Sequence, residues 1–349
     1  MDRVACRASP NLALVKYWGK LDRGRNLPAT PSLGLALGGL ETLTLARIAE
    51  GGEDSLLVDG RPDLSDRARA FFHEARAVLR VSHHFEVRSE SNFPARAGLA
   101  SSSSGFAALA LTLARLSGRA AEGAAVAELA RRGSASAARA LCGGFSYFPR
   151  GGRAALPLLG AEHWPELRIL VAVVARAPKS WPSREAMVAT AATSPYYRAW
   201  LRDAPRIARR ARTACADREL DELGRAMLLS YSRMHAALLA SDPPRLYWTP
   251  GTLAILETCA RLRSEGFAAY ETVDAGPQVK ILCREAEVRD LAARLEGCTP
   301  EAEFLLARPG PAPQLYELDV GEPDPPPLPP PRLEPSAARV EPIGVGGLR

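Results

Sequence analysis

Residues 89–105 constrain this chain more than any other segment, because they carry four consecutive serines directly before an apolar helix pattern rich in Ala and Leu. The alternating residues 85–90 predict a short strand, and residues 106–116 predict the helix. A glycine in the intervening loop lets the backbone approach an anion, while the unpaired N–H groups and the dipole at the helix start supply positive potential. The layout therefore predicts a phosphate-binding loop at a helix N-terminus. A serine N-cap before an ordinary core helix is the alternative, since the loop is neither a Walker A nor a dinucleotide fingerprint.

Residues 11–20 form an apolar strand pattern that ends in two lysines, Lys16 and Lys20, which flank Tyr17 and Trp18. Of the 45 basic side chains in the chain only four are lysine, and the others are arginine. A planar guanidinium does not replace the compact point charge of an ammonium on a phosphate. The retained lysine pair therefore favours a second anion-binding element. Two solvated cations at a strand end are the ordinary alternative.

The composition permits an intracellular enzyme and argues against several other classes. With 349 residues, 47% of them hydrophobic and 24% charged, the chain can bury a large core and is long enough for about two domains. The net charge of +6 is spread along the sequence, so we expect neither nucleic-acid nor membrane binding. Six cysteines without a Cys-x-x-Cys pair indicate reduced thiols in the cytoplasm. We expect no signal peptide and no membrane-spanning segment.

Strand and helix patterns follow one another without regular alternation, which favours an α+β fold. Strands are predicted at residues 42–48, 85–90, 168–174, 267–273 and 278–283. Helices are predicted at residues 64–80, 106–116, 204–220, 223–240, 250–264 and 285–296, with two more between 120 and 142 that break at Gly133 and Ser134. The strand at 168–174 is continuously apolar, which implies burial on both faces. Because Pro165 interrupts the chain just before it, we expect one domain over residues 1–165 and a second over 166–308.

The end of the chain differs in composition. From Pro309 onward proline and glycine accumulate, and residues 325–331 contain six prolines. Such a segment cannot form a helix or a central strand. We expect residues 309–349 to form an extended, disordered tail without catalytic work, with docking to a partner as the alternative.

Two further segments carry groups suited to binding anions. Ser134, Ser136 and Arg139 lie at the start of a predicted short helix, where Ser136 and Arg139 share a face because they are three residues apart. Ser183 and Arg184 are predicted to lie in a basic, hydroxyl-bearing loop that follows the buried strand. Segments at strand ends commonly supply binding residues.

Asp274 ends an apolar strand at a tight turn made by Gly276 and Pro277. Taken alone, an aspartate in such a place is most often a turn-forming residue whose side chain bonds the backbone. A catalytic carboxylate is the alternative.

In their order and approximate spacing, these segments resemble the diphosphomevalonate decarboxylase family, a branch of the GHMP kinase superfamily. The resemblance extends over most of the chain before the proline-rich end. It rests on residues 11–20 with Lys-Tyr-Trp-Gly-Lys at 16–20, Leu-Pro-Ala-Thr-Pro-Ser-Leu at 27–33, the serine loop at 89–105, Gly-Ser-Ala-Ser-Ala-Ala-Arg at 133–139, Ser-Arg at 183–184 and Asp-Ala-Gly-Pro at 274–277. The first and last of these motifs are specific to the decarboxylase branch, whereas the serine loop is shared across the superfamily.

The resemblance implies a GHMP kinase fold. Residues 1–165 would form an ATP-binding domain like the second domain of ribosomal protein S5, and residues 166–308 a ferredoxin-like domain. The implied reaction is ATP-dependent decarboxylation of mevalonate 5-diphosphate to isopentenyl diphosphate, ADP, phosphate and CO₂, in the mevalonate pathway of isoprenoid biosynthesis. ATP and Mg²⁺ would be the cofactors, and a cytoplasmic homodimer is the usual assembly in the family.

Matched residue by residue, the resemblance assigns three catalytic side chains. Asp274 would orient the 3-hydroxyl of the substrate and accept its proton, Arg139 would hold the C1 carboxylate, and Lys16 would lie near the reacting groups. Contacts to the substrate, chiefly to its diphosphate, would come from Tyr17, Lys20, Ser134, Ser136, Arg139, Ser183 and Arg184. The loop around the ATP phosphates would comprise Pro94, Gly98, Leu99, Ala100, Ser101, Ser102 and Ser103, with Ser102 contacting the Mg²⁺ that ATP carries.

The chain departs from the family pattern at four positions, because Ala135 replaces a glycine, Arg96 a small residue, Gln278 an asparagine and Pro182 a serine. None of these changes removes a catalytic group. Within the superfamily, a phosphomevalonate decarboxylase or a mevalonate 3-kinase-like enzyme is the alternative. A catalytically silent metabolite-binding protein of the same fold is the alternative of another class. His235 lies among apolar helix neighbours, and we expect it to be a packed core histidine.

Overall fold

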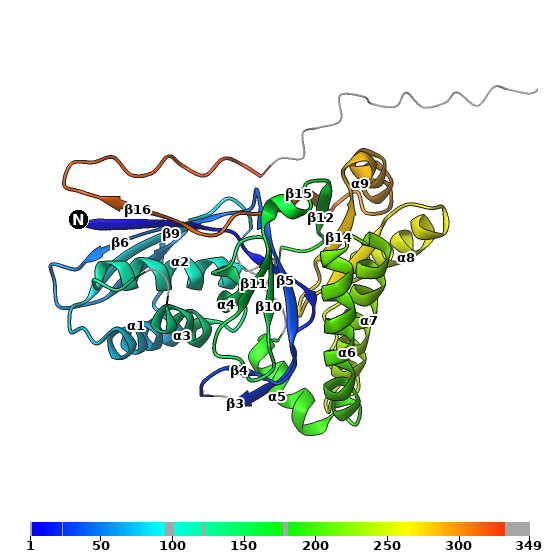
Figure 1. Ribbon diagram of the computed structural model, residues 1–349, viewed down its shortest axis with the longest axis horizontal. Helices are drawn as coiled ribbons and strands as arrows, with labels where there is room; N and C mark the ends of the chain where they lie inside the picture. Colours follow the sequence, from blue (N-terminus) through cyan, green and yellow to red (C-terminus); the bar gives the residue numbers. More distant parts are fainter. Residues whose placement is uncertain (1, 23, 95–100, 121–122, 177–180, 332–349) are drawn as a thin grey trace, which may run out of the picture.

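The computed structural model describes residues 2–22, 24–94, 101–120, 123–176 and 181–331. Two large sheets and the helices packed on them make up this part of the chain (Figure 1). Both element types contribute to each half, so the α+β class expected from the sequence is confirmed.

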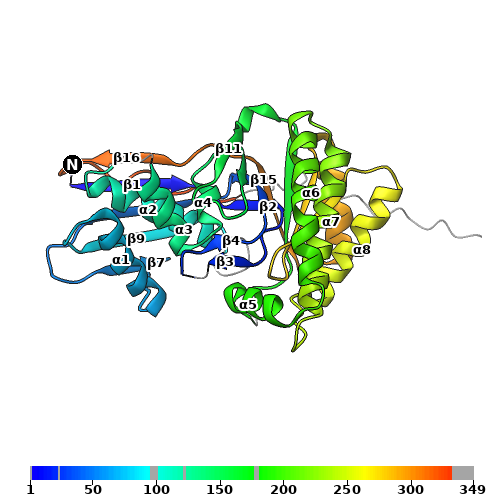
Figure 2. The same ribbon diagram turned by 60° about the horizontal axis from the view of Figure 1, so that its bottom comes forward.

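The first sheet has six strands in the order β16-β1-β6-β9-β7-β8. Their bounds are β1 (Arg3–Ala8), β6 (Thr42–Ile48), β7 (Ser55–Val58), β8 (Arg61–Pro62), β9 (Phe85–Ser91) and β16 (Gln314–Leu318). One face is covered by the helices α1 (Asp66–Leu79), α2 (Ser101–Leu116) and α3 (Ala124–Gly133), as Figures 1 and 2 show. Side chains such as Phe71, Phe85 and Leu113 fill the space between the helices and the sheet.

The second sheet contains strands from both halves of the sequence. Its strands run in the order β11-β10-β5-β15-β12-β14-β13, and β2 pairs with β5 beside this path. Their bounds are β2 (Asn11–Val15), β5 (Ser32–Gly38), β10 (Phe145–Phe148), β11 (Leu156–Leu159), β12 (Leu167–Val173), β13 (Tyr270–Val273), β14 (Val279–Arg284) and β15 (Glu303–Pro309). Arg308 and Pro309 pair with Gly38 and Leu37, so one continuous sheet carries strands from before and after the expected boundary at Pro165.

Strand β12 is buried on both faces, as its apolar sequence predicts. Ile169 and Val171 pack on one side with Ile207, whereas Leu170 packs on the other side with Ile255. The helices that form these two layers are α6 (Tyr197–Ala216), α7 (Leu220–Leu239), α8 (Pro250–Ser264) and α9 (Val288–Cys298). The remaining elements are β3 (Lys20–Asp22), β4 (Leu27–Pro28), α4 (Ala137–Ala140), α5 (Ser183–Thr193), η1 (Ala161–His163) and η2 (Glu285–Glu287).

Helix α2 begins earlier than its apolar pattern predicts. The sequence favours a start at Phe106, whereas the helix begins at Ser101, so the four serines form its first turn. The hydroxyl of Ser104 bonds back to the carbonyl oxygen of Ser101 at 3.2 Å, which lets a serine lie inside a helical turn. The serine hydroxyls therefore lie on the helix itself and not in the loop before it.

The C-terminal segment also differs from expectation. Residues 314–318 form β16, which pairs antiparallel with β1, so the expected disorder from residue 309 onward is wrong there. This short stretch contains no proline, and the free edge of β1 offers it a row of backbone hydrogen-bonding groups. Farther along, the side chains of Arg3, Arg7 and Asn92 donate to backbone carbonyl oxygens of Glu322, Pro326 and Pro329. Residues 332–349 lie outside the described part.

Within the described ranges, no helix combines the length and the apolar character needed to cross a lipid bilayer.

Candidate active site

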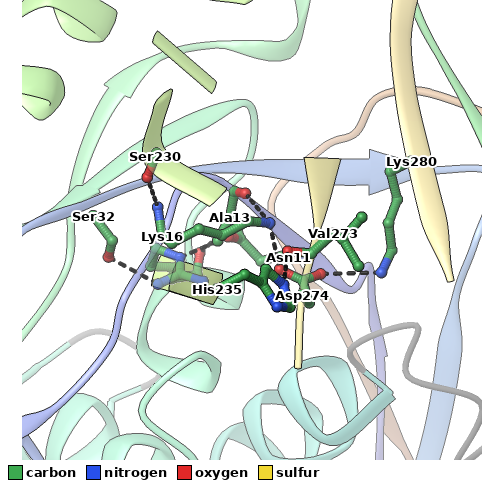
Figure 3. Close-up of polar contacts among 10 residues, drawn as sticks. Asn11, Ala13, Lys16, Ser32, Ser230, His235, Val273, Asp274 and Lys280 are labelled. Carbon is green, nitrogen blue, oxygen red and sulfur yellow. Dashed lines mark hydrogen bonds and ion pairs between the residues drawn. The ribbon is translucent and has the colours of Figure 1, made fainter. Parts of the chain in front are cut away.

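The site is centred on an ion pair between Asp274 and Lys16 (Figure 3). Asp274 follows the end of β13, and Lys16 follows the end of β2. The Lys16 ammonium donates to Asp274 Oδ1 at 2.6 Å and to the carbonyl oxygen of Ala13 at 3.0 Å. The Lys16 side chain is 2% exposed, whereas that of Asp274 is 26% exposed. The lysine therefore supports a carboxylate that remains partly open to solvent.

A second lysine, Lys280 of β14, contacts the other carboxylate oxygen. Its ammonium lies 3.0 Å from Asp274 Oδ2, and its side chain is also 2% exposed. Sequence reasoning did not include Lys280 in the site. The signal was available, because Lys280 is one of only four lysines and lies six residues after Asp274 on the same predicted hairpin.

The charges of this cluster shift the pKa values of Asp274 and Lys16. Burial opposes charge on Asp274, but the ammonium groups of Lys16 and Lys280 outweigh it and hold the pKa of this carboxyl well below its usual range. Burial lowers the pKa of Lys16 to about 8, even though Asp274 acts in the opposite direction. Near neutral pH the carboxylate is therefore anionic, and Lys16 is close to its point of deprotonation.

His235 of α7 lies beside this cluster as a buried, neutral ring. Its Nε2 is 3.3 Å from the carbonyl oxygen of Val273, and burial lowers its pKa to about 4. The expectation of a packed core histidine is confirmed, since the residue is only 1% exposed.

Arg139 of α4 is held in a buried network next to the cluster. Its Nε donates to Asn11 Oδ1 at 2.8 Å, and its Nη1 donates to Ser32 Oγ at 2.9 Å. The backbone N–H of Asn11 donates to Ser103 Oγ at 3.0 Å, so Asn11 links the guanidinium to the first turn of α2. Burial lowers the pKa of Arg139 to about 10, and the charge of Asp274 opposes this effect. Asn11 was not among the predicted site residues, although it begins the segment 11–20 that the sequence analysis singled out.

A second cationic cluster consists of Lys20 of β3, Arg67 of α1 and Arg184 of α5. Burial lowers the pKa of Lys20 to about 8, and the charges of Arg184 and Arg67 lower it further. The charge of Asp63 acts on the pKa of Arg67 in the opposite direction to burial, and Arg67 also donates to the carbonyl oxygen of Gly133 at 2.9 Å. Three cations gathered in this way favour a bound anion. Arg67 has no sequence signal, because it is one arginine among many on a helix.

Tyr17 lies between the two clusters. Its hydroxyl is buried and has no hydrogen-bond partner among the described residues. Burial raises the pKa of Tyr17, while the nearby charges of Arg139 and Arg184 act in the opposite direction. A buried hydroxyl that lacks a partner costs free energy unless a ligand supplies one.

The two predicted serine segments occupy different positions. Ser134 and Ser136 lie directly before α4, with their hydroxyl oxygens 2.9 Å apart. Ser183 is the first residue of α5 and Arg184 is the second, so their segment forms a helix start and not a loop.

The predicted phosphate loop is only partly described. Ser101 and Ser102 are half-buried in the first turn of α2, whereas Ser103 is fully buried against Asn11. Pro94 is half-buried three residues after β9. The predicted residues Gly98, Leu99 and Ala100 lie outside the described residues, as does Arg96.

The donor set fits a metal ion that is held mainly by phosphate oxygens. The described residues contain no group of three His, Cys, Asp or Glu side chains able to form a metal site of their own. Serine hydroxyls at the start of α2 are hard oxygen donors, and Mg²⁺ takes few protein ligands when it is bound together with a nucleotide.

Comparison with known proteins agrees with this chemistry. The profile of the diphosphomevalonate decarboxylase-like N-terminal domain matches residues 8–156, and that of the mevalonate 5-diphosphate decarboxylase C-terminal domain matches residues 169–308. The diphosphomevalonate decarboxylase of Candida albicans is 32% identical over 309 residues, which cover 82% of this chain and 85% of that protein.

Solved structures match over nearly their whole length. A complex of the protein designated MDDEF with MVAPP, AMPPCP and magnesium superposes with a TM-score of 0.85 at 30% identity, covering 91% of this chain and 99% of that one. A structure of mevalonate diphosphate decarboxylase from Enterococcus faecalis, which concerns ATP binding mediated by mevalonate diphosphate, gives a TM-score of 0.84 with the same identity and coverage.

Proposed function

The chain belongs to the diphosphomevalonate decarboxylase family, and we propose how its own residues perform the ATP-dependent decarboxylation of mevalonate 5-diphosphate. Its fold is the GHMP kinase-type α+β fold expected from the sequence, and ATP and Mg²⁺ are its cofactors. One observation carries the assignment of roles. The Asp274 carboxylate is partly open to solvent, is held between two buried ammonium groups, and shares its surroundings with Arg139.

The cluster of Lys20, Arg67 and Arg184 binds the diphosphate of the substrate. Asp63 offsets part of the positive charge of this cluster, and a diphosphate carries enough negative charge to interact with all three cations. The unpartnered hydroxyl of Tyr17 donates to the same group. Ser134, Ser136 and Ser183 add hydroxyls at the starts of two short segments near this cluster.

Arg139 binds the C1 carboxylate of the substrate. Its Nε and one terminal nitrogen are already bonded to Asn11 and Ser32, so the guanidinium is fixed before substrate arrives. A fixed guanidinium orients the carboxylate at little entropic cost. The carbon–carbon bond to this carboxylate, which breaks in the reaction, is thereby held in a defined direction.

Asp274 accepts a hydrogen bond from the 3-hydroxyl and directs its oxygen toward the γ-phosphoryl group of ATP. With its lowered pKa, Asp274 is a weak base toward a free alcohol. It takes the proton as the oxygen bonds to the γ-phosphorus, when the hydroxyl proton becomes acidic, and the bond between this phosphorus and ADP breaks so that ADP leaves. The phosphorylated oxygen then leaves as phosphate while the bond to the carboxylate carbon breaks, giving the alkene and CO₂. Lys16 keeps Asp274 anionic and lies where negative charge develops.

Ser101 and Ser102, in the first turn of α2, interact with the ATP phosphates and with Mg²⁺. Mg²⁺ neutralises the charge that develops on the transferred phosphoryl group. Ser103 has a different role, because its buried hydroxyl accepts a hydrogen bond from the backbone of Asn11. Asn11 in turn accepts a hydrogen bond from Arg139, so Ser103 connects the helix to Arg139.

Product analysis tests this function. Purified protein is given MgATP with mevalonate 5-diphosphate or mevalonate 5-phosphate in parallel, and ADP and CO₂ are quantified. We expect equal amounts of ADP and CO₂ with the diphosphate, and a higher kcat/KM for it than for the monophosphate. ADP without CO₂ would indicate a kinase that stops after phosphoryl transfer. Binding without turnover would indicate a catalytically silent protein.

The cellular setting and assembly are part of the proposal. All six cysteines are free thiols, which suits the reducing cytoplasm. The family resemblance favours a homodimer, and light scattering of the purified protein measures its mass directly. The resemblance also favours residues 1–165 and 166–308 as the two domains.

A further inference from the structure

So far Lys280 has been given no part in the reaction beyond the effect of its charge on Asp274. Its ammonium lies 3.0 Å from Asp274 Oδ2, on the side of the carboxylate opposite to Lys16 (Figure 3). Each oxygen of Asp274 therefore has its own lysine.

The hairpin of β13 and β14 fixes this arrangement. Thr272 pairs with Lys280, and Val273 pairs with Val279. Lys280 therefore lies beside the end of β13, which Asp274 follows directly in the chain. Strand β14 lies between β12 and β13. Apart from Lys280, its residues from Val279 to Cys283 are apolar, and all of them are buried. Burying a lysine in such a strand costs desolvation free energy, which an apolar residue would not require. Fold stability alone does not account for it.

The second lysine also changes the charge balance of the site. Two ammonium groups on one carboxylate leave an excess of positive charge, and Arg139 adds to it. Burial is the main reason for the lowered pKa of Lys16, and the charge of Lys280 lowers it further. Charged and titratable groups that act on Lys16 from the neighbouring elements are Asp274, Lys280, Arg139 and His235.

We propose that Lys280 is a positioning residue for the decarboxylation, which fixes the rotation of the Asp274 carboxylate through Oδ2. The charge of Lys280 also disfavours the proton on Lys16. This inference rests on the proposed role of Asp274. With Oδ2 engaged by Lys280, the carboxylate plane cannot turn away from the substrate hydroxyl. A carboxylate bound on one side only rotates more freely, and small misplacements of a reacting group are costly.

The test compares Lys280→Met, Lys280→Arg and Arg284→Met. Arg284 is the matched control, because it ends the same strand but is half-exposed and pairs with Glu287. For each variant, kcat, KM for both substrates and the pH dependence of kcat/KM are measured, with circular dichroism and a melting curve to establish folding.

We expect Lys280→Met to lower kcat about 10²-fold while KM changes much less. We also expect the basic limb of its kcat/KM profile to be less steep and to lie at higher pH, because Lys16 loses a repelling neighbour while Lys20 still titrates near pH 8. Lys280→Arg keeps the charge and should recover part of kcat and return the limb toward the wild-type position, and Arg284→Met should behave like wild type.

A folded Lys280→Met enzyme with kcat near wild type would overturn the inference, as would a loss of kcat with an unmoved basic limb that Lys280→Arg does not repair. A parallel Asp274→Asn variant separates this failure from that of the proposed function. If Asp274→Asn is inactive while Lys280→Met is fully active, only the positioning role fails. If Asp274→Asn is active, the role of Asp274 fails, and the inference fails with it.

Discussion

Gly34 on β5 leaves the space through which the guanidinium of Arg139 reaches Asn11. A Cβ at position 34 would lie 2.7 Å from Arg139 Nε and 2.0 Å from Asn11 Oδ1. Both atoms belong to the hydrogen bond that fixes Arg139, so any side chain at this position must displace that bond. The glycine is thus required by the neighbouring site and not by its own backbone conformation.

Gly34→Ala should lower kcat/KM for mevalonate 5-diphosphate at least about tenfold, because Arg139 loses its fixed position. The control is Gly297→Ala on α9, where a Cβ meets nothing within 4 Å. Steady-state kinetics of the two variants decide the matter. Wild-type kinetics in folded Gly34→Ala protein would show that the position of Arg139 is not critical.

Arg67→Met should raise KM for mevalonate 5-diphosphate about tenfold or more, because the diphosphate loses one charge-assisted contact. KM for ATP should change little. Arg69→Met is the matched control, since Arg69 lies on the same helix but is exposed and pairs with Asp66. If the two variants show equal KM values for the substrate, Arg67 does not bind the diphosphate.

The pH dependence of kcat/KM should show a basic limb near pH 8. Lys16 and Lys20 have pKa values lowered to about 8, chiefly by burial, and both must be protonated to act on anions. Their charge is present below this pH and is lost as the pH rises through it. Bound phosphate groups favour the protonated lysines, so the limb of kcat should lie at higher pH than that of kcat/KM. A kcat/KM that stays constant up to the ordinary lysine pKa of 10.5 would contradict both assignments.

Removal of residues 314–349 should destabilise the protein more than removal of residues 319–349. The longer deletion removes β16 and exposes the edge of β1, whereas the shorter one loses only the contacts of the proline-rich segment. We expect the longer deletion to cost about 2 kcal/mol more, the net worth of a few backbone hydrogen bonds after the cost of ordering the strand. Urea unfolding of the two truncated proteins measures this difference, and equal midpoints would show that β16 adds no stability.

Hydrophobic periodicity predicted many of the helices and strands, and the errors of these predictions have physical causes. Helix α8 and strand β6 have the predicted bounds, because their apolar patterns coincide with the elements themselves. The start of α2 was misplaced, since serines do not show the apolar periodicity that marks a helix interior. Strand β16 was missed because its partner, β1, lies about 300 residues away in sequence and stabilises a segment with little preference of its own.

Some residues of the candidate site could likewise be predicted from the sequence, and others could not. Lys16 and Asp274 lie in separate motifs, and their contact at a sequence separation of 258 residues is visible only in the fold. Lys280 could have been found from the rarity of lysine in this chain and from its place on the hairpin after Asp274. Arg67 could not, because its role depends on where α1 packs relative to β3 and α5, and no local pattern distinguishes it from the other arginines.

The most direct measurement of the central claim is product formation by Asp274→Asn beside wild type, with MgATP and mevalonate 5-diphosphate. The variant keeps the size and one oxygen of the side chain but loses its negative charge and its ability to take the proton. The account predicts that CO₂ release falls at least about 10³-fold while the folded variant still binds mevalonate 5-diphosphate, because the diphosphate and carboxylate contacts remain. CO₂ release near the wild-type rate by the folded variant would contradict it.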